Sequence, residues 1–598
     1  MKQPWRNLAL LLFAAAVVLG GLAGGNLLAI LDAGDMGQVR VYTELVEAAH
    51  ANYAVDDVTY RDLVYASIGG MLRNLDPHTS FLPPVAYDTM RERQQSSFYG
   101  LGIYVGTRNN RLTVISPIEG TPGFEKGIRA GDIIHLINGE PTEEMNPNEA
   151  IRKLKGPKGT DVTVTLLRPG LDEPLEVTVT RAEIPQETVR HAHMLTPETG
   201  FLWITDFSRS TGGEVARALA ELREQGMKRL ILDLRFNGGG LLDQAIAVSD
   251  QFVPPGTTIV QTRGRIDSSH QSYRSTGRHE PLGLPIVVLV NGSSASASEI
   301  VSGAIQDHDV GLVVGESTWG KGLVQTVYEL SYGAGLALTT ARYYTPAGRL
   351  IQRDYSSYWD YYTGYDANGD NGDEDEEGPG PAAPAPLLDP PDKEERPVFY
   401  TDLGRKVYGG GGVTPDYVVE LEDDPPVITR LRIQSGFHRF PFEQGVPEGV
   451  DSTDWRVPDD YLERFWDWIV EEDLVSAEEL DEALEEPAVE RHARVRLRYE
   501  IFNTAFGLTE GFKAERQLDN QLARALELLD EAEELLERRM EQDRRTRGGN
   551  RSSGLVAGAG APAFRPASNA SREAASQSYP RNRAATASQS TTFQKAFR

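Results

Sequence analysis

Three short, largely apolar runs, each followed by a segment with helical character, constrain the fold of this chain more than any other feature. The runs are Gly200–Phe207, Arg229–Arg235 and Pro285–Val290. The first leads to an amphipathic stretch from Gly213 to Gln225, and the second leads to Leu241–Phe252. Continuous apolar runs of this length are typical of strands buried on both faces of a sheet. Their alternation with helices predicts a layered α/β domain.

The length and charge of the chain narrow the classes of protein that it fits. Its 598 residues exceed what one hydrophobic core usually supports, so several domains are expected. A formal net charge of −28 argues against nucleic acid as a partner. The absence of cysteine from the sequence excludes disulfides, thiolate metal sites and a cysteine nucleophile.

Residues 1–35 are predicted to form a cytoplasmic stub and a membrane anchor. Lys2 and Arg6 precede the uncharged stretch Leu8–Leu31, whose length suits a helix that crosses a bilayer. The stretch is longer than the apolar part of a typical cleaved signal peptide, although its glycines leave cleavage open. With Asp32 and Asp35 on the far side, the charges predict an exported catalytic part. A single pass through the bacterial inner membrane, with the rest of the chain in the periplasm, fits best.

The next segment, residues 36–97, is predicted to be helical from its apolar spacing. It contains the turn Leu75–Leu82, in which Asp76 and His78 are interpreted as residues that hold the turn by local hydrogen bonds.

Residues 98–183 resemble a PDZ domain in the order of their strands and turns. The pattern runs through Phe98–Val105, Gly127–Ile134, and the alternating strands Val162–Leu167 and Leu175–Thr180. A PDZ domain binds a peptide by adding it as a strand to a sheet edge. The resemblance therefore implies a partner with a free, nonpolar C-terminal tail.

The terminal carboxylate of that tail is expected to bind the backbone amides of Gly100, Leu101, Gly102 and Ile103. The alternative for this segment is a tight turn without a ligand. Arg129 lies between two glycines in the same region and is a regulatory candidate, because a basic residue there can pair with an acid on the catalytic body. A solvated surface arginine is the alternative.

Two motifs within residues 184–430 carry the chemistry. Ser296 lies in the small-residue run Asn291–Ile300, and Lys321 lies in the glycine-punctuated segment Gly315–Gln325. A serine nucleophile needs a base, and a lysine can serve when burial lowers its pKa. The pairing of Ser-Ala-Ser-Glu-Ile with Gly-Lys-Gly-Leu-Val-Gln resembles the carboxyl-terminal processing proteases, the S41 family of Ser-Lys peptidases.

The resemblance implies an α/β multidomain protein in which a PDZ domain precedes an α/β protease core of the ββα type. It also implies a serine endopeptidase that cleaves near the C-termini of exported proteins and needs neither a metal nor another cofactor. The expected catalytic residues are Ser296 as nucleophile, Lys321 as base and Gln325 as its orienting partner. The oxyanion hole is assigned to the amides of Ala297 and Gly239, with Gly240 as the alternative to the latter. A tethered PDZ scaffold with an inactive hydrolase body is the competing function.

Three other kinds of site fit the sequence less well. A phosphate-binding loop around Lys321 would need Ser or Thr at Gly322 and a helix after it. His308 and Asp307 are neighbours on a predicted helix, where side chains point about 100° apart, so they make a poor relay. His191 and His193 share one face of a strand, but no third zinc ligand has a suitable spacing.

The remaining segments show no catalytic pattern. Residues 354–395 are predicted to be a solvated acidic insertion, although Asp366, Asn368, Asp370 and Glu377 follow a calcium-loop register that Asn371 spoils. Residues 452–542 are predicted to be helical, docking on the protease, a sister subunit or a partner, and they indicate a homo-oligomer. Residues 543–598 are predicted to be disordered.

Overall fold

The structure, a computed structural model, describes residues 33–55, 57–108, 111–168, 171, 173–278, 281–353 and 396–552. Three predictions concern residues outside these ranges: the membrane anchor at Leu8–Leu31, the acidic insertion at 354–395 and the tail beyond residue 552. Within the described ranges, no helix combines the length and the apolar character that crossing a membrane requires.

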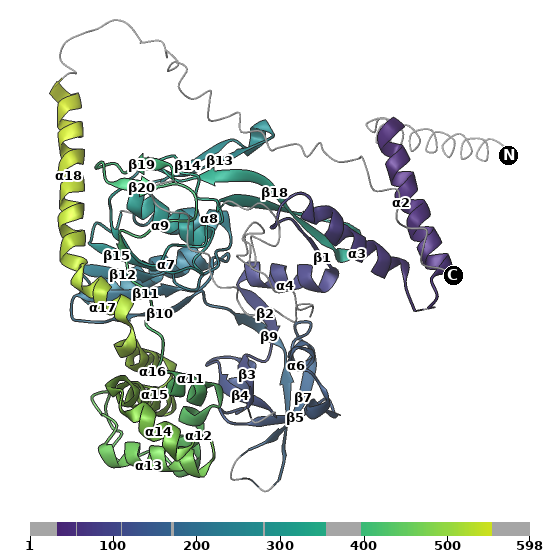
Figure 1. Cartoon of the computed structure of the whole chain (residues 1–598), viewed down its shortest axis with the longest axis vertical. Helices are drawn as coiled ribbons and strands as arrows, with labels where there is room; N and C mark the ends of the chain where they lie inside the picture. The colour runs from purple at the N-terminus through teal and green to yellow at the C-terminus, as the bar shows by residue number, and fades with distance from the viewer. Residues whose placement is uncertain are drawn as a thin grey trace, which may run out of the picture. The chain divides into compact units, whose positions relative to one another are not determined.

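A six-stranded sheet forms the centre of the α/β region (Figure 1). Its order is β10-β11-β12-β15-β16-β21, in which β10 is antiparallel to β11 and the other pairs are parallel. The strands are β10 (Val189–Met194), β11 (Thr199–Ile204), β12 (Arg229–Asp233), β15 (Ile286–Val290), β16 (Leu312–Gly315) and β21 (Tyr417–Val418). The three apolar runs of the sequence are β11, β12 and β15, which confirms the layered α/β prediction.

Side chains of these strands alternate between two cores, as the strand period requires. Leu230 and Leu232 pack with the helices of one layer, and Ile231 between them points to the opposite face. The helices of the first layer are α7 (Thr211–Glu224), α8 (Leu242–Ser249) and α9 (Ala297–Asp307).

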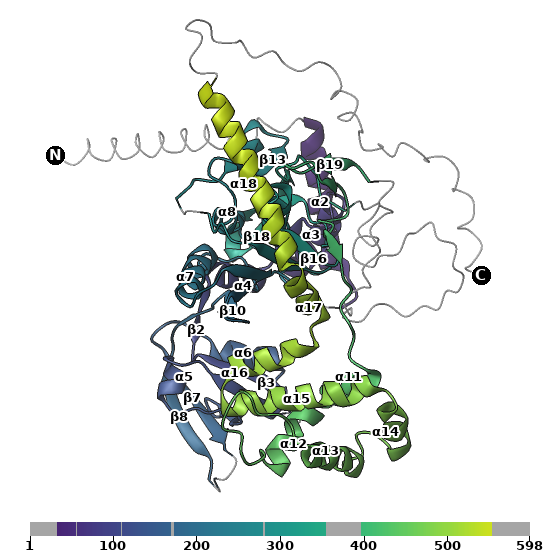
Figure 2. The ribbon, with the colours of Figure 1, turned by 90° about the vertical axis from the view of Figure 1, so that its left-hand side faces the viewer.

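The opposite face of the sheet is covered by the C-terminal part of the chain. Helix α17 (Asn520–Glu527) lies over β15 and β16, and helix α18 (Leu529–Ser552) follows it (Figure 2). Leu522 and Leu528 are buried there against Ile231 and Val287. Three docking sites were open for the C-terminal helices, and in the structure α17 packs on the protease sheet of the same chain.

A second, antiparallel sheet borders the first helical layer. Its order is β1-β18-β13-β14, and β17 also pairs with β18. The strands are β1 (Ser80–Leu82), β13 (Thr258–Gly264), β14 (Gln271–Arg274), β17 (Leu323–Glu329) and β18 (Gly335–Tyr344). Strand β1 belongs to the segment predicted to be helical, whose helices are α2 (Ala33–Asn52), α3 (Tyr60–Arg73) and α4 (Pro84–Gln95). Its three residues are extended because they add to the edge of β18.

The predicted PDZ region has its own sheet and core. The sheet order is β3-β4-β5-β7-β8, with β6 (Glu140–Pro141) paired to β5. Its elements are β3 (Ile103–Arg108), β4 (Arg111–Pro117), α5 (Pro122–Glu125), β5 (Ile133–Ile137), α6 (Pro147–Leu154), β7 (Asp161–Leu167) and β8 (Leu175–Thr180). Strands β2 (Ser97–Gly100) and β9 (Ala182–Pro185) pair with each other where the chain enters and leaves this region.

The helical C-terminal region begins earlier than predicted, at Pro426, where proline suits the first turn of a helix. Its helices are α11 (Pro426–Ile433), α12 (Gly436–Gln444), α13 (Asp459–Glu471), α14 (Ala477–Leu484), α15 (Pro487–Ala505) and α16 (Leu508–Glu515). The chain divides into two units, residues 1–540 and 541–598. The prediction of disorder from residue 543 is wrong up to Ser552, because the Glu- and Arg-rich sequence continues α18 with pairs such as Glu541–Arg545.

Candidate active site

Ser296 lies on the sharp connection between β15 and α9. Its φ is 55°, a left-handed value that is uncommon for a residue with a side chain. The Ser294 hydroxyl donates to the Leu234 carbonyl and the Ser298 hydroxyl to the Asn237 carbonyl, each at 2.9 Å, while Ser293 is exposed. Ser296 instead lines a cavity of about 370 Å³. Among the four serines, it is the one whose hydroxyl opens onto that cavity.

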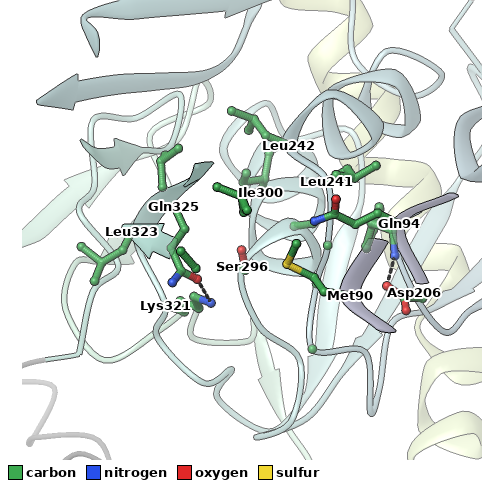
Figure 3. A pocket seen from close by; sticks show the side chains of 18 of the residues that line it. Met90, Gln94, Asp206, Leu241, Leu242, Ser296, Ile300, Lys321, Leu323 and Gln325 are labelled. Atoms are coloured by element: carbon green, nitrogen blue, oxygen red, sulfur yellow. Dashed lines mark hydrogen bonds between the residues drawn. The ribbon is translucent and has the colours of Figure 1, made fainter. Parts of the chain in front are cut away.

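Lys321 lines the same cavity and lies two residues before the start of β17. Its Nζ donates to Gln325 Oε1 at 2.8 Å (Figure 3). Gln325 Nε2 donates in turn to the His78 carbonyl at 2.7 Å. Burial lowers the pKa of the Lys321 amine, although the carboxylates of Glu299 and Asp76 act in the opposite direction. The sequence prediction of a Lys321–Gln325 contact is therefore met. No hydrogen bond joins Ser296 Oγ to Lys321 Nζ among the described residues.

Glu299 connects the loops that carry these two residues. Its carboxylate accepts hydrogen bonds from the backbone amides of Ser296 at 2.7 Å and Lys321 at 2.9 Å. It also accepts from the Gly320 amide at 2.7 Å and from the Thr318 hydroxyl at 2.5 Å. Glu299 is fully buried, and burial raises the pKa of its carboxyl. One side chain thus fixes the spacing between the serine loop and the lysine loop.

The glycine loop, residues 236–240, forms the third side of the site. A Cβ added to Gly239 would lie 2.8 Å from Ser296 Cβ and 2.9 Å from the Ala297 nitrogen, so the two loops touch. The φ of Gly239 is 95°, which also favours glycine. Its amide donates to Asn237 Oδ1 at 2.9 Å. The Ala297 amide is the first of α9 and has no intrahelical acceptor.

The rest of the cavity wall is largely apolar and comes from distant parts of the chain. Met90 belongs to α4, and Figure 3 shows it on the opposite side of Ser296 from Lys321. Further apolar side chains in the wall are Leu241, Leu242, Ile300, Leu323, Val324 and Val327. At the rim, Arg93 of α4 forms an ion pair with Asp206. A serine hydroxyl, an amine whose pKa is lowered by burial, and backbone amides therefore share one cavity.

Comparisons with known proteins agree with this geometry. Residues 198–356 match "Peptidase family S41", and residues 88–167 match "PDZ domain". A carboxy-terminal-processing protease of Bartonella bacilliformis is 38% identical over 321 residues, covering 53% of this chain and 73% of the relative. The chain belongs to peptidase family S41. It is a serine-type peptidase of the carboxyl-terminal processing group and carries a PDZ domain.

Two further likenesses accompany that match. A carboxyl-terminal-processing protease of Synechocystis is 38% identical over 301 residues, covering 49% of this chain and 69% of the relative. The solved photosystem II D1 C-terminal processing protease is 32% identical, with 52% of this chain and 84% of that chain covered and a TM-score of 0.30.

In this S41 protease, the residues predicted to bind a peptide carboxylate line a second cavity. Gly100, Leu101, Gly102 and Ile103 surround a space of about 290 Å³ together with apolar residues of α6. Strand β3 is at the end of the PDZ sheet order, so one edge of it has no partner strand within that sheet. Gly102 also makes the tight turn of the alternative interpretation, because its φ is 78° and a Cβ there would lie 2.3 Å from Thr121.

The other sequence candidates are spread across the S41 protease. The Arg129 side chain is exposed, so its regulatory role stays a prediction. His308 pairs with Asp402 through Nδ1 at 2.8 Å, and Asp307 pairs with Arg349 instead, so the two neighbours form no relay. The segment after Lys321 is strand β17 where a phosphate-binding loop needs a helix.

The last three candidates, His191, His193 and Asp76, have contacts that are typical of structural residues. His191 and His193 both pack against Phe512 of α16, and burial lowers their pKa values to about 4 and about 3. Asp76 accepts bonds from the His78 and Thr79 amides at 2.8 and 2.7 Å, which confirms its role in holding the turn.

Sequence reasoning missed two residues that organise the site. Glu299 was visible in the Ser-Glu-Ile motif, and a carboxylate three residues after a helix-capping serine is a signal for backbone contacts. Asp519 of the C-terminal region bonds to Arg235 beside the glycine loop. Its position before α17 indicates a helix cap, but nothing in the sequence links it to Arg235.

Proposed function

We propose that this S41 protease cleaves exported proteins near their C-termini by Ser-Lys chemistry. Ser296 Oγ attacks the carbonyl carbon of the scissile bond, and the neutral amine of Lys321 takes the hydroxyl proton. The ammonium of Lys321 then protonates the leaving amine, and the acyl group stays on Ser296. Water, deprotonated by the same lysine, hydrolyses that ester and regenerates the enzyme.

The observation that carries this proposal is the shared cavity of Ser296 and Lys321, with Glu299 bonded to both of their backbone amides. The lysine works as a base only when uncharged, and the lowered pKa from burial supports that state. Gln325 would orient the amine by its 2.8 Å bond. A Ser296–Lys321 hydrogen bond is expected with substrate bound, since such contacts are often long in the free enzyme.

The developing oxyanion would bind the backbone amides of Ala297 and Gly239. The Gly239 amide donates to Asn237 Oδ1 in this structure, so it must exchange that acceptor for the oxyanion. Gly240 is the alternative donor of the same loop. The apolar cavity wall suits a nonpolar stretch of extended peptide, and the carboxyl terminus of that tail would bind the Gly100–Ile103 amides of the PDZ domain.

The location and assembly of the protein form a separate part of the proposal. The apolar stretch Leu8–Leu31, with basic residues before it and acidic residues after it, supports a single-pass anchor in the bacterial inner membrane and a periplasmic catalytic part. A homo-oligomer is supported by α2, where Val39, Val41 and Leu45 are each more than half exposed. Protease accessibility in spheroplasts and the mass of the detergent-solubilised protein test these two points.

The catalytic roles are tested with a fluorogenic peptide that ends in a nonpolar, free C-terminus. The Ser296→Ala and Lys321→Ala variants are expected to lose at least about a thousandfold in kcat, as removal of a serine nucleophile does elsewhere. Ser293→Ala is the matched control, because its side chain is exposed in the same loop, and it should cleave like the wild type. Amidation of the peptide terminus should raise KM. Equal cleavage by wild type and Ser296→Ala would leave the PDZ scaffold as the better account.

A further inference from the structure

Arg235 is a buried cation at the edge of the active site. Its side chain is 1% exposed, and all five of its N–H donors are bonded. Asp233 accepts from Nε and Nη2, and Asp519 accepts from Nη1 and Nη2 with distances of 2.8 and 2.6 Å. Gln521 Oε1 accepts the fifth bond at 2.9 Å. A guanidinium this deeply buried is tolerated only when such partners are complete.

Three of these five bonds come from the C-terminal region. Asp519 caps α17, since its carboxylate also accepts from the Leu522 amide at 2.9 Å, and Gln521 lies in the first turn of that helix. The Gln521 side chain is held in turn, because its Nε2 donates to the Val419 carbonyl at 2.7 Å. The match to the S41 family ends at residue 356, so these acceptors are supplied by a part of the chain outside it.

Arg235 directly precedes the glycine loop. The next residue, Phe236, has a φ of 59° and donates its amide to Asn291 of the serine loop at 3.0 Å. Asn237 then accepts from the Ala295 amide at 3.0 Å and from the Ser298 hydroxyl at 2.9 Å. The turn from Arg235 to Gly239 therefore connects the buried guanidinium to Ala295 and Ser298, which flank Ser296 in the sequence.

We propose that Asp519 and Gln521 are positioning residues for the glycine loop, so that the C-terminal helical region takes part in catalysis. This inference rests on the proposed role of the loop in binding the oxyanion. Neither residue touches the substrate. They bind the side chain of Arg235, and Arg235 fixes the start of the glycine loop. The position of the Gly239 amide follows from where that loop starts. Without them, three guanidinium donors would be buried without acceptors, and the loop would shift to bring the guanidinium toward water.

The chain supplies a matched control at Arg229, the first residue of β12, whereas Arg235 follows the end of that strand at Asp233. Arg229 begins β12 and pairs with Asp530 of α18 at 2.6 Å, but the Asp530 side chain is 82% exposed and lies at the strand end away from the glycine loop. Asp519→Asn and Asp530→Asn thus each remove one negative charge from the C-terminal region, and each of these charges pairs with an arginine on or just after β12. The two aspartates differ in burial and in how far the paired arginine lies from the glycine loop, and Asp519 also accepts from Arg516 Nη1 at 2.7 Å.

The experiment compares the two variants in the full-length protein. For Asp519→Asn, kcat is expected to fall about ten- to a hundredfold with little change in KM, because a small misplacement of transition-state donors costs rate without weakening binding. Gln521→Ala, which keeps the charge pair, should fall less and in the same direction. Asp530→Asn should match the wild type. Thermal melts establish that the compared samples are folded.

Hydrogen exchange measured by mass spectrometry gives a readout that needs no catalysis. Amides of residues 236–240 should exchange faster in Asp519→Asn than in the wild type, and at the wild-type rate in Asp530→Asn. Unchanged exchange in the glycine loop of Asp519→Asn, or kcat equal to that of Asp530→Asn, overturns the inference. If the wild type cleaves no peptide, the proposed function fails while the exchange data still decide whether Asp519 holds the loop.

Discussion

The most direct test of the proposed oxyanion hole is the Gly239→Ala substitution, which adds a single methyl group to the glycine loop. An alanine Cβ there would lie 2.7 Å from the Ala295 carbonyl oxygen, 2.8 Å from Ser296 Cβ and 2.9 Å from the Ala297 nitrogen. Carbon atoms do not approach side-chain and backbone atoms this closely, so the glycine loop must move away from the serine loop. The positive φ of 95° adds roughly 1–2 kcal/mol of backbone strain for a residue with a side chain.

The magnitude of the loss follows from what the loop does. A displacement near 1 Å costs on the order of a hundredfold in rate, and loss of one oxyanion donor costs about a hundred- to a thousandfold in kcat. Gly239→Ala should therefore lower kcat about a hundred- to a thousandfold. KM should change little, because the methyl group acts on the transition state and leaves the PDZ groove intact.

Gly238→Ala is the control for this prediction. A Cβ on Gly238 meets nothing within 4 Å, so the same substitution one residue earlier should leave the loop in place and kcat near the wild-type value, although KM can change because Gly238 lines the cavity. Both variants are assayed with the tail peptide under saturating conditions, after thermal melts confirm folding. If Gly239→Ala retains wild-type kcat, or if both variants lose activity equally, the assignment of this loop to the oxyanion is wrong.

Three further predictions concern the lysine and its surroundings. First, kcat/KM should rise with pH through an ionisation below the ordinary lysine value of about 10.4, as Lys321 loses its proton; a flat profile would exclude it as the base. Second, Glu299→Gln should move that rise to lower pH, because the Glu299 charge raises the Lys321 pKa, and should reduce kcat roughly tenfold as the carboxylate hydrogen bonds to the loops weaken. Third, the pKa of Lys321 is lower in the folded protein than in the unfolded chain, so the unfolded chain binds the proton more tightly. The free energy of unfolding therefore falls as the pH drops below about 10.4, and the buried lysine destabilises the fold at pH 7. Lys321→Met should thus unfold at an equal or higher temperature than the wild type, and a markedly lower one would contradict the pKa argument.

The elements that the sequence predicted well are those whose signal is local. Strands β12 and β15 appear as short apolar runs because both faces of a central parallel strand are buried. The Lys321–Gln325 contact was expected from an even spacing on one extended segment, and the bond forms even though the β17–β18 register shifts between Val324 and Gln325. Motif and periodicity suffice where the partners lie within a few residues.

The parts that were not predicted depend on contacts between distant residues. Arg235 and Asp519 are 284 positions apart, and each looks ordinary in its own segment. The position of α4 was equally hidden, although Met90 lines the catalytic cavity, because apolar spacing identifies a helix and not its docking face. The same limit explains why the C-terminal helices had three possible docking sites before the structure placed Leu522 against the sheet.

The candidate active site is held together by bonds from three regions of the chain. The serine and lysine loops meet at Glu299 of the core, the glycine loop is held through Arg235 by the C-terminal region, and Gln325 donates to the His78 carbonyl of the N-terminal region. The distances among the proposed nucleophile, base and oxyanion donors therefore depend on contacts from outside the S41 core as well. Since catalytic rate falls steeply with small errors in these distances, the proposed mechanism requires both flanking regions to be docked on the core.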